Sequence, residues 1–551
     1  MTNAVAASHT PGLPGRANTQ SREPRGELIR WFSKPATALA LIVVSGAALR
    51  ILKITDYSLW GDEGFSAAIV MQPWRPFWLS ILYEPWTAFY FVLLKPWTLC
   101  FGTGEVALRS LSVVLGLVAI VAIYYLGERL FSRRAGLIAA AMTAVSPVQI
   151  WYSQEVRGYS LYVLLSALCW LAFLAALHNS RPRNLSIWSV LMVLMGYCHF
   201  IGLGIIPAQW VCIAIRRPDL SSVKRLALAT AAAAVALALI PIFMVTLNSG
   251  QAGWIAPLSW AEIADVFVTV SGGLHGNAGA IFCLTYVLLL IWAFLGSFQK
   301  GNDRSGWESC AFASAGFLVP IMATIAGGFF VPMLMGRYLL LCFPPFVVLA
   351  AQGLLTVRPR KAALIVVAAL VALTAWELRD SYNLESRDDW RSTAQYVMRH
   401  GQPGDAAIFV TPECRYAFQY YAAREPNTAA FPVILGENRD LVDGIRIVTN
   451  RFPSYTSGVL GKVGSLPKSY RRIWLMKPGS IDLDPRDPNK RESVQLAAAL
   501  AHEYRTHPPV IFNGVSVWLY DTPDASAAAA AQPVRSAVPR LAAAPTMNRK
   551  S

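Results

Sequence analysis

The chain has 551 residues, of which 55% are hydrophobic and 15% are charged, and it carries a formal net charge of +16. This apolar content, with a mean hydropathy of +0.43, excludes an ordinary soluble protein. Apolar runs long enough to cross a hydrocarbon layer of about 30 Å recur along residues 35–376, so the sequence predicts a polytopic α-helical membrane protein. The basic residues are spread between these runs rather than gathered in one patch, which excludes nucleic acid as a partner.

Eleven membrane spans are predicted after a polar, basic segment, residues 1–34, that we interpret as a disordered cytoplasmic tail. The stretch 185–215 is interpreted as two short spans, because a single span there would spoil the alternation of basic loops described below. The predicted spans are residues 35–52, 108–126, 135–150, 159–177, 185–199, 201–215, 226–247, 278–298, 310–330, 338–355 and 362–376.

Every second loop between these spans is basic, and basic loops are typical of the cytoplasmic side. Arg133, Arg217 and Arg360 belong to this basic set. We therefore expect the chain to lie in the cytoplasmic (inner) membrane. The segments expected on its outer, periplasmic side are residues 53–107, 151–158, 248–277 and the C-terminal part.

The first outer loop combines an apolar stretch too short to cross, Phe89–Cys100, with surrounding tryptophans and prolines. Aromatic residues of this kind favour the headgroup region. Residues 66–100 are therefore predicted to form one or two interfacial helices on the outer leaflet.

An acid pair, Asp62 and Glu63, stands directly after the first span in the motif Trp60-Gly61-Asp62-Glu63. The simple interpretation is that these acids cap an interfacial helix beginning near Gly64, since acids favour helix N-termini. Capping requires only one short polar side chain, however, and this pair has aromatic neighbours able to shape a pocket. The alternative is a catalytic carboxylate at the membrane surface.

Two arginines at the outer ends of spans, Arg157 and Arg337, are candidate ligands for a phosphate, because a guanidinium group matches phosphate oxygens. Their simpler interpretations are an ion pair with Glu155 for Arg157 and an interfacial anchor for Arg337. A single histidine such as His199 is more often packed than catalytic. The candidates for a sugar or acceptor pocket are Trp60, Glu84, Tyr152, Glu155, Tyr159 and His199.

From about residue 377 the composition becomes that of a soluble domain, and we expect a small extracytoplasmic α/β domain over residues 377–522. A helix is predicted at Asp389–His400, and the Ala- and Pro-rich residues 523–551 are predicted to be disordered. Strands are predicted at Ala407–Val410, Ile445–Thr449, Arg472–Met476 and, flanking an Asn513-Gly514 turn, at Val510–Phe512 and Val515–Tyr520.

The sequence contains no Walker loop, dinucleotide fingerprint, metal-ligand cluster or Ser/His/Asp set with useful spacing. An enzyme at the outer face has no access to ATP or nucleotide sugars, so we expect its activated substrate to be carried by a lipid. The sequence requires no cofactor, and it leaves a need for a divalent metal open.

Several segments in a fixed order resemble the GT-C glycosyltransferases of the family 39 type, and the resemblance covers about residues 35–355. This group includes protein O-mannosyltransferases, aminoarabinose transferases of lipid A and galacturonosyltransferases of lipopolysaccharide core. Many of its members have a His-Pro-Pro element where this chain has Glu84-Pro85-Trp86, which bears on sugar or acceptor preference. The segments that carry the resemblance are Leu59–Glu63, Phe101–Ser110, Ser146–Tyr159 and Gly336–Leu339 with Pro344.

The resemblance implies inverting transfer of a sugar from a polyprenyl-phosphate donor to an acceptor. It implies that Asp62 is the general base and that Glu63 is the second acid of the pair. It also implies that Arg157 and Arg337 lie near the donor phosphate. The acceptor is expected to be an envelope lipid, glycan or protein.

The sequence disfavours two other classes of protein. A transporter or flippase of lipid-linked sugars would place broken helices and charged residues near the bilayer midplane, whereas the ionisable residues here gather at the outer ends of spans. A sensor or scaffold that binds through its C-terminal domain would have no use for the acid pair.

Overall fold

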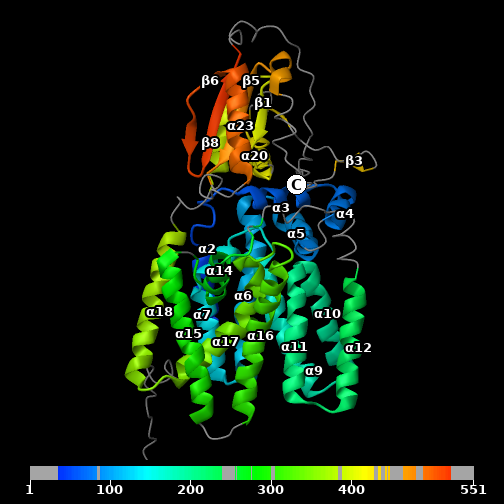
Figure 1. Ribbon diagram of the computed structural model, residues 1–551, viewed down its shortest axis with the longest axis vertical. Helices are drawn as coiled ribbons and strands as arrows, with labels where there is room; N and C mark the ends of the chain where they lie inside the picture. Colours follow the sequence, from blue (N-terminus) through cyan, green and yellow to red (C-terminus); the bar gives the residue numbers. More distant parts are fainter. Residues whose placement is uncertain are drawn as a thin grey trace, which may run out of the picture.

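The structure is a computed structural model of an elongated helical bundle with a small sheet domain at one end (Figure 1). We call the end beside the sheet domain the upper end, as drawn. The residues that the structure describes are 35–83, 87–238, 255, 257–274, 276–299, 304–382, 388–411, 413–426, 432–435, 441–442, 445–446, 463–479 and 488–522.

Each of the eleven predicted spans overlaps a helix among the described residues, although residues 239–247 of the predicted span 226–247 lie outside them. Among the described residues, seven helices are long and apolar enough to cross a membrane, or eight when one bent pair is counted as a single span. The others are shorter. The helices are α2 (Pro35–Ile51), α6 (Glu105–Leu130), α7 (Arg133–Val145), α9 (Tyr159–His178), α10 (Pro182–Cys198), α11 (Ile205–Arg216), α12 (Leu220–Leu237), α15 (Gly276–Gln299), α16 (Arg304–Gly328), α17 (Phe343–Thr356) and α18 (Arg360–Ser381).

The predicted span over residues 135–150 is not one continuous helix but a bent pair of helices. Helix α7 ends at Val145, and the chain turns by 60° into the short helix α8 (Pro147–Ser153). Pro147 stands at the first position of α8, because proline disfavours helical geometry in the residue before it but suits a helix start. The buried Arg50 guanidinium holds the break: it donates to the carbonyl oxygen of Ala144 at 2.8 Å and to Ser153 Oγ at 3.1 Å.

Residues 185–215 form two helices, in agreement with the prediction of two short segments rather than one. Helices α10 and α11 are joined by a 3₁₀ turn, η2 (Phe200–Gly204). The indole of Trp188 donates a hydrogen bond to Gln209 Oε1 at 2.9 Å, and both side chains are buried. The pair therefore ties the two short helices together inside the bundle.

The first outer loop forms three helices where one or two were predicted, and the first of them begins at Gly61 rather than near Gly64. They are α3 (Gly61–Met71), α4 (Trp74–Tyr83) and α5 (Ala88–Phe101). Pro73 follows the end of α3, where a proline cannot continue the helix. Trp74 and Trp78 are half exposed on α4 while Phe77 is buried, which is the amphipathic pattern of an interfacial helix.

The C-terminal region is the small α/β domain that the sequence predicts. The six strands of its sheet run in the order β2-β1-β5-β8-β6, with β7 paired to β8; β1 is parallel to β2 and β5, and the other pairs are antiparallel. The strands are β1 (Ala406–Phe409), β2 (Val433–Ile434), β5 (Arg472–Pro478), β6 (Arg505–Thr506), β7 (Val510–Phe512) and β8 (Val515–Asp521), and a separate pair is β3 (Leu441–Val442) with β4 (Ile445–Arg446).

The predicted strands at Ala407–Val410, Arg472–Met476 and the Asn513-Gly514 hairpin are confirmed, with boundaries shifted by one or two residues. Of the predicted strand Ile445–Thr449, only β4 lies within the described residues. The domain's helices are α19 (Trp390–His400), α20 (Cys414–Ala422), η6 (Val463–Lys468) and α23 (Pro488–Glu503).

The sheet domain rests on the bundle through α19 and α20, while α23 covers the opposite face of the sheet. One continuous apolar core runs from the bundle into α19 and α20, and a second core joins α23 to the alternate side chains of β1 and β5. Helix α20 lies against α3 so closely that a Cβ atom added to Gly64 would come within 2.3 Å of the Ala417 backbone nitrogen (Figure 1). The domain is thus packed directly against the loop that carries the acid pair.

Candidate active site

The two acids of the predicted pair lie in different environments. Adjacent residues of a helix point about 100° apart, so Asp62 and Glu63 cannot face the same group. The Glu63 side chain is fully buried, whereas that of Asp62 is 25% exposed. Of the two acids, only Asp62 has a side chain that is accessible from outside the protein.

Glu63 is fixed by an ion pair with Arg109 of α6. Arg109 Nε donates to Glu63 Oε1 at 2.9 Å and its Nη2 donates to Oε2 at 2.7 Å, a two-bond geometry that suits guanidinium and carboxylate. Glu63 Oε2 also accepts from the backbone N–H of Trp60 at 3.4 Å, so Glu63 rather than Asp62 caps α3. Helix capping, the simpler interpretation of the acid pair, therefore holds for Glu63.

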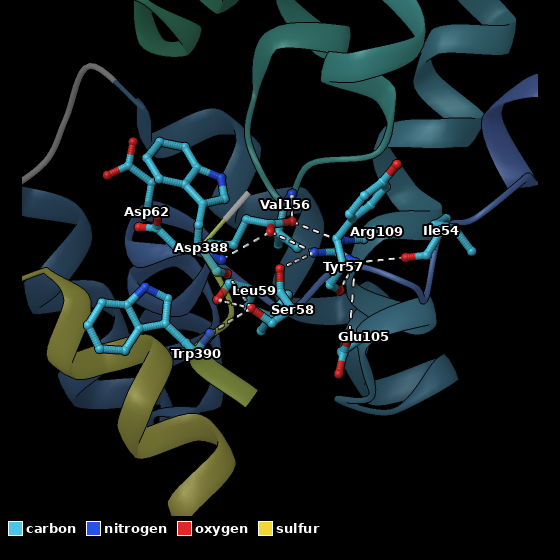
Figure 2. Close-up of polar contacts among 12 residues, drawn as sticks. Ile54, Tyr57, Ser58, Leu59, Asp62, Glu105, Arg109, Val156, Asp388 and Trp390 are labelled. Carbon is cyan, nitrogen blue, oxygen red and sulfur yellow. Dashed lines mark hydrogen bonds and ion pairs between the residues drawn. The ribbon is translucent and has the colours of Figure 1, made fainter. Parts of the chain in front are cut away.

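Arg109 also organises the segment that leads into α3. Its remaining donors bind backbone carbonyl oxygens: that of Ile54 at 2.7 Å, that of Tyr57 at 3.0 Å and that of Ser58 at 3.0 Å (Figure 2). A buried arginine in this position pairs its charge and satisfies its donors at the same time. The backbone before Asp62 is consequently held in one conformation.

The sheet domain holds the same segment from its other side. Arg391 Nη2 donates to Glu105 Oε2 at 2.6 Å and to the carbonyl oxygen of Thr55 at 2.9 Å. The Tyr421 hydroxyl accepts from the backbone N–H of Leu59 at 2.7 Å. Residues of α19 and α20 thus contribute to the position of Asp62.

Residues 151–158 are held beside the acid pair by a hydrogen bond, which places Arg157 close to Asp62. The backbone N–H of Val156 donates to Glu63 Oε1 at 3.0 Å, and the next side chain, Arg157, places Nη2 3.7 Å from Asp62 Oδ2. Burial lowers the pKa of the Arg157 guanidinium, but the Asp62 carboxylate and Tyr159 raise it, and the net result lies above the usual value. The Arg157 side chain is 19% exposed and fully charged.

Arg337 joins this group from η3 (Gly336–Cys342). Its charge interacts with Asp62 and with Tyr152 and Tyr159, and its guanidinium lies 5.7 Å from the Tyr338 ring centre. Asp265, on α14 (Trp260–Ser271), accepts from the backbone N–H of Gly336 at 3.2 Å and so fixes the start of η3. Two arginines from distant parts of the chain therefore lie on one side of Asp62.

The predicted pocket residues occupy different positions around this group. The rings of Tyr152 and Tyr159 lie 4.6 Å apart beside the arginines. His199 is buried, lies 4.6 Å from the Tyr338 ring and accepts at Nδ1 from the backbone N–H of Ile201 at 3.3 Å, which matches a packed histidine. Glu155 is buried, Trp60 is partly buried beside α3, and Glu84 lies outside the described residues.

Three residues of the site carry no local sequence signal that distinguishes them: Arg109, Arg391 and Asp265. Arg109 is separated from Glu63 by 46 positions, and Arg391 from Glu105 by 286. Only the quoted segment Phe101–Ser110, which contains Arg109, could have drawn attention to one of them. Within the described part of the chain, no three His, Cys, Asp or Glu side chains form a group able to hold a metal ion.

Comparisons with known proteins agree with this fold. A family model described as dolichyl-phosphate-mannose-protein mannosyltransferase matches residues 85–246. The structure is similar to that of ArnT from Cupriavidus metallidurans in the apo state, with a TM-score of 0.56 and 13% identity over 88% of this chain and 98% of that chain. The same protein bound to undecaprenyl phosphate gives a TM-score of 0.56 and 13% identity over 87% and 97%.

The archaeal oligosaccharyltransferase AglB from Archaeoglobus fulgidus, in complex with an inhibitory peptide and a dolichol-phosphate, gives a TM-score of 0.52 at 12% identity, over 89% of this chain and 75% of that chain. No curated protein matches the sequence significantly. The GT-C fold expected from the sequence is confirmed.

Proposed function

We propose that this protein transfers a sugar from a polyprenyl-phosphate donor to a hydroxyl group of an envelope lipid, glycan or protein, with inversion. The observation that carries the proposal is the partly exposed Asp62 carboxylate 3.7 Å from Arg157, with Arg337 beside it. A base and two cations at one end of a helical bundle are what such a transfer needs. Two of the similar structures contain undecaprenyl phosphate and dolichol-phosphate, which supports a donor of this kind.

The proposed mechanism uses these three side chains directly. Asp62 takes the proton of the acceptor hydroxyl as its oxygen attacks the anomeric carbon of the donor sugar. The bond between that carbon and the phosphate oxygen breaks, and the phosphate leaves with the electron pair. Arg157 and Arg337 stabilise the negative charge that develops on the phosphate. A single displacement of this kind inverts the anomeric configuration.

Glu63 has a positioning role in this proposal. Its carboxylate is buried and bound by Arg109 and by the Val156 N–H, so it does not meet the acceptor. It connects the loop that carries Asp62 to the loop that carries Arg157. The distance between base and cation therefore depends on Glu63.

The direction of the helices supports an outer location for the site. Helix α3, which carries Asp62, lies with the sheet domain at the upper end of the bundle (Figure 1), and Arg157 pairs with Asp62 there. The helix ends near Arg133, Arg217 and Arg360 lie at the opposite end, and basic ends are typical of the cytoplasmic side. We infer that the site and the sheet domain face the periplasm, above the cytoplasmic membrane.

The proposal is tested by the product. Envelope lipids, glycans and proteins of a deletion strain are compared with wild type by mass spectrometry, and the missing sugar is then offered to the purified protein on a polyprenyl phosphate. A new glycosidic bond made in vitro supports the function, whereas unchanged envelope composition and no product contradict it. Reporter fusions after residues 134 and 380 test the orientation, and both in one compartment would contradict it.

A further inference from the structure

A second acid approaches Asp62 from the sheet domain. Glu413 directly precedes α20, the helix that packs on α3. A Cβ atom added to Gly61, the residue before Asp62, would lie 3.5 Å from the Glu413 Cβ atom. The charges of Glu413 and Asp62 act on one another. Nothing in the local sequence indicates this contact, because 351 positions separate the two acids.

One oxygen of the Glu413 carboxyl group has no partner among the described residues, although a backbone hydrogen bond acts on the carboxylate. This oxygen, Oε2, is buried. Burial raises the pKa of Glu413 to about 7, the negative charge of Asp62 adds to this shift, and Arg415 opposes it. An acid in this state can either donate or accept a hydrogen bond near neutral pH. Buried polar atoms without a partner are rare in folded proteins and require an explanation.

The charges around Asp62 are arranged asymmetrically. Arg157 and Arg337 come from the helical bundle, whereas Glu413 comes from the sheet domain, where the charge of Arg415 also acts on it. A phosphate is attracted to Arg157 and Arg337 and repelled by an ionised Glu413. A neutral hydroxyl group can donate its proton to a carboxylate and accept from a protonated carboxyl, so it suits the side between Asp62 and Glu413.

We propose that Glu413 is a specificity-determining residue that binds the acceptor between α20 and Asp62 and selects a neutral, hydroxyl-bearing group over an anionic one. This inference rests on the glycosyl transfer proposed above and names the acceptor side of the same site. The sheet domain thereby completes the active site rather than standing apart from it. The attacking group is then the hydroxyl of a sugar or alcohol, not the oxygen of a phosphate.

The test compares Glu413→Gln and Glu413→Lys with wild type in transfer to two probes, a short-chain alkyl glucoside and the same glucoside carrying a 6-phosphate. Wild type should prefer the neutral probe. Glu413→Gln should raise the KM for the neutral probe about tenfold or more with the donor KM unchanged, and Glu413→Lys should shift the preference toward the phosphorylated probe. Glu503→Gln, on α23 at the opposite face of the sheet, is the matched control and should behave as wild type.

The possible outcomes separate this inference from the proposed function. An active wild type whose acceptor KM and probe preference do not change in either variant overturns the role of Glu413 and leaves the function intact. Wild-type protein that prefers the phosphorylated probe also overturns the role of Glu413, and this result does not depend on whether either variant folds. A wild type that transfers no sugar from any polyprenyl phosphate overturns both.

Discussion

Arg109 and Glu63 form a fully buried ion pair, with Nη2 and Oε2 2.7 Å apart, and this pair joins α6 to the first turn of α3. The same arginine binds three backbone carbonyl oxygens of residues 54–58, and the same glutamate binds the N–H of Val156. Both loops of the site are therefore anchored to one charge pair.

Removing one partner of this pair should destabilise the protein strongly. Arg109→Ala leaves a buried carboxylate without its cation, and such a change costs about 3–5 kcal/mol. We expect a large fall in the midpoint of thermal unfolding, measured in detergent by tryptophan fluorescence. Glu128→Gln removes an exposed pair with Arg133 and should change stability by less than about 1 kcal/mol. Equal effects of the two variants would show that the buried pair has no special structural role.

The contact between α3 and α20 should tolerate no side chain at Gly64. A methyl group there would come within 2.3 Å of the Ala417 backbone, which neither helix can relieve by a side-chain movement. We expect Gly64→Ala to cost about 1–3 kcal/mol and to increase proteolysis of the sheet domain. Gly104→Ala is the control, because nothing lies within 4 Å of a Cβ atom at that position. A stable, protease-resistant Gly64→Ala variant would disprove the close packing.

The two arginines should act on the donor. Charge-assisted hydrogen bonds from Arg157 or Arg337 to the donor phosphate are worth about 1.5–3 kcal/mol each. Replacing either by Ala should raise the donor KM and lower kcat while the acceptor KM stays close to that of wild type. Steady-state kinetics with varied donor checks this, with the exposed Arg133→Ala as control. Unchanged donor kinetics in both variants would leave these residues as interfacial anchors.

The sheet domain should show a pH-dependent stability that comes from Asp388. Burial raises the pKa of this carboxyl to about 6, above its value in the unfolded chain. The folded state therefore keeps a proton that the unfolded state loses first, so the contribution of Asp388 to stability falls as pH rises from about 4 to about 6 and then levels off. The fall should be about 1–3 kcal/mol. Asp388→Asn should lose this contribution and keep that of Glu413, so its stability should fall less than that of wild type between about pH 4 and about pH 6. An identical pH profile in both proteins would contradict this assignment.

Much of the fold could be predicted from local patterns. Each apolar run overlaps a helix among the described residues, and the Asn513-Gly514 turn predicted the β7–β8 hairpin. The 60° turn at Pro147 was missed because the run of apolar residues continues through it. The turn is held by hydrogen bonds from the buried Arg50 to residues that lie 93 to 103 positions further along the chain.

The site was predicted only in part, again because some of its contacts join residues that are far apart in the sequence. Asp62, Arg157 and Arg337 stand at the ends of spans, and their positions along the chain indicated that they would meet near the membrane surface. The different environments of Asp62 and Glu63 depend on Arg109, and the approach of Glu413 depends on the packing of α20. Contacts of this kind join segments that no local pattern relates.

Asp62→Asn tests the central claim most directly. The amide keeps the size and much of the hydrogen bonding of the carboxylate but cannot take a proton from the acceptor. General-base assistance is worth about 10²–10⁴-fold, so kcat of the purified enzyme should fall by at least that range while donor affinity and thermal stability change little. Glu63→Gln should lower kcat less and stability more. An Asp62→Asn enzyme that is folded, binds donor and turns over at nearly the wild-type rate would contradict Asp62 as the base.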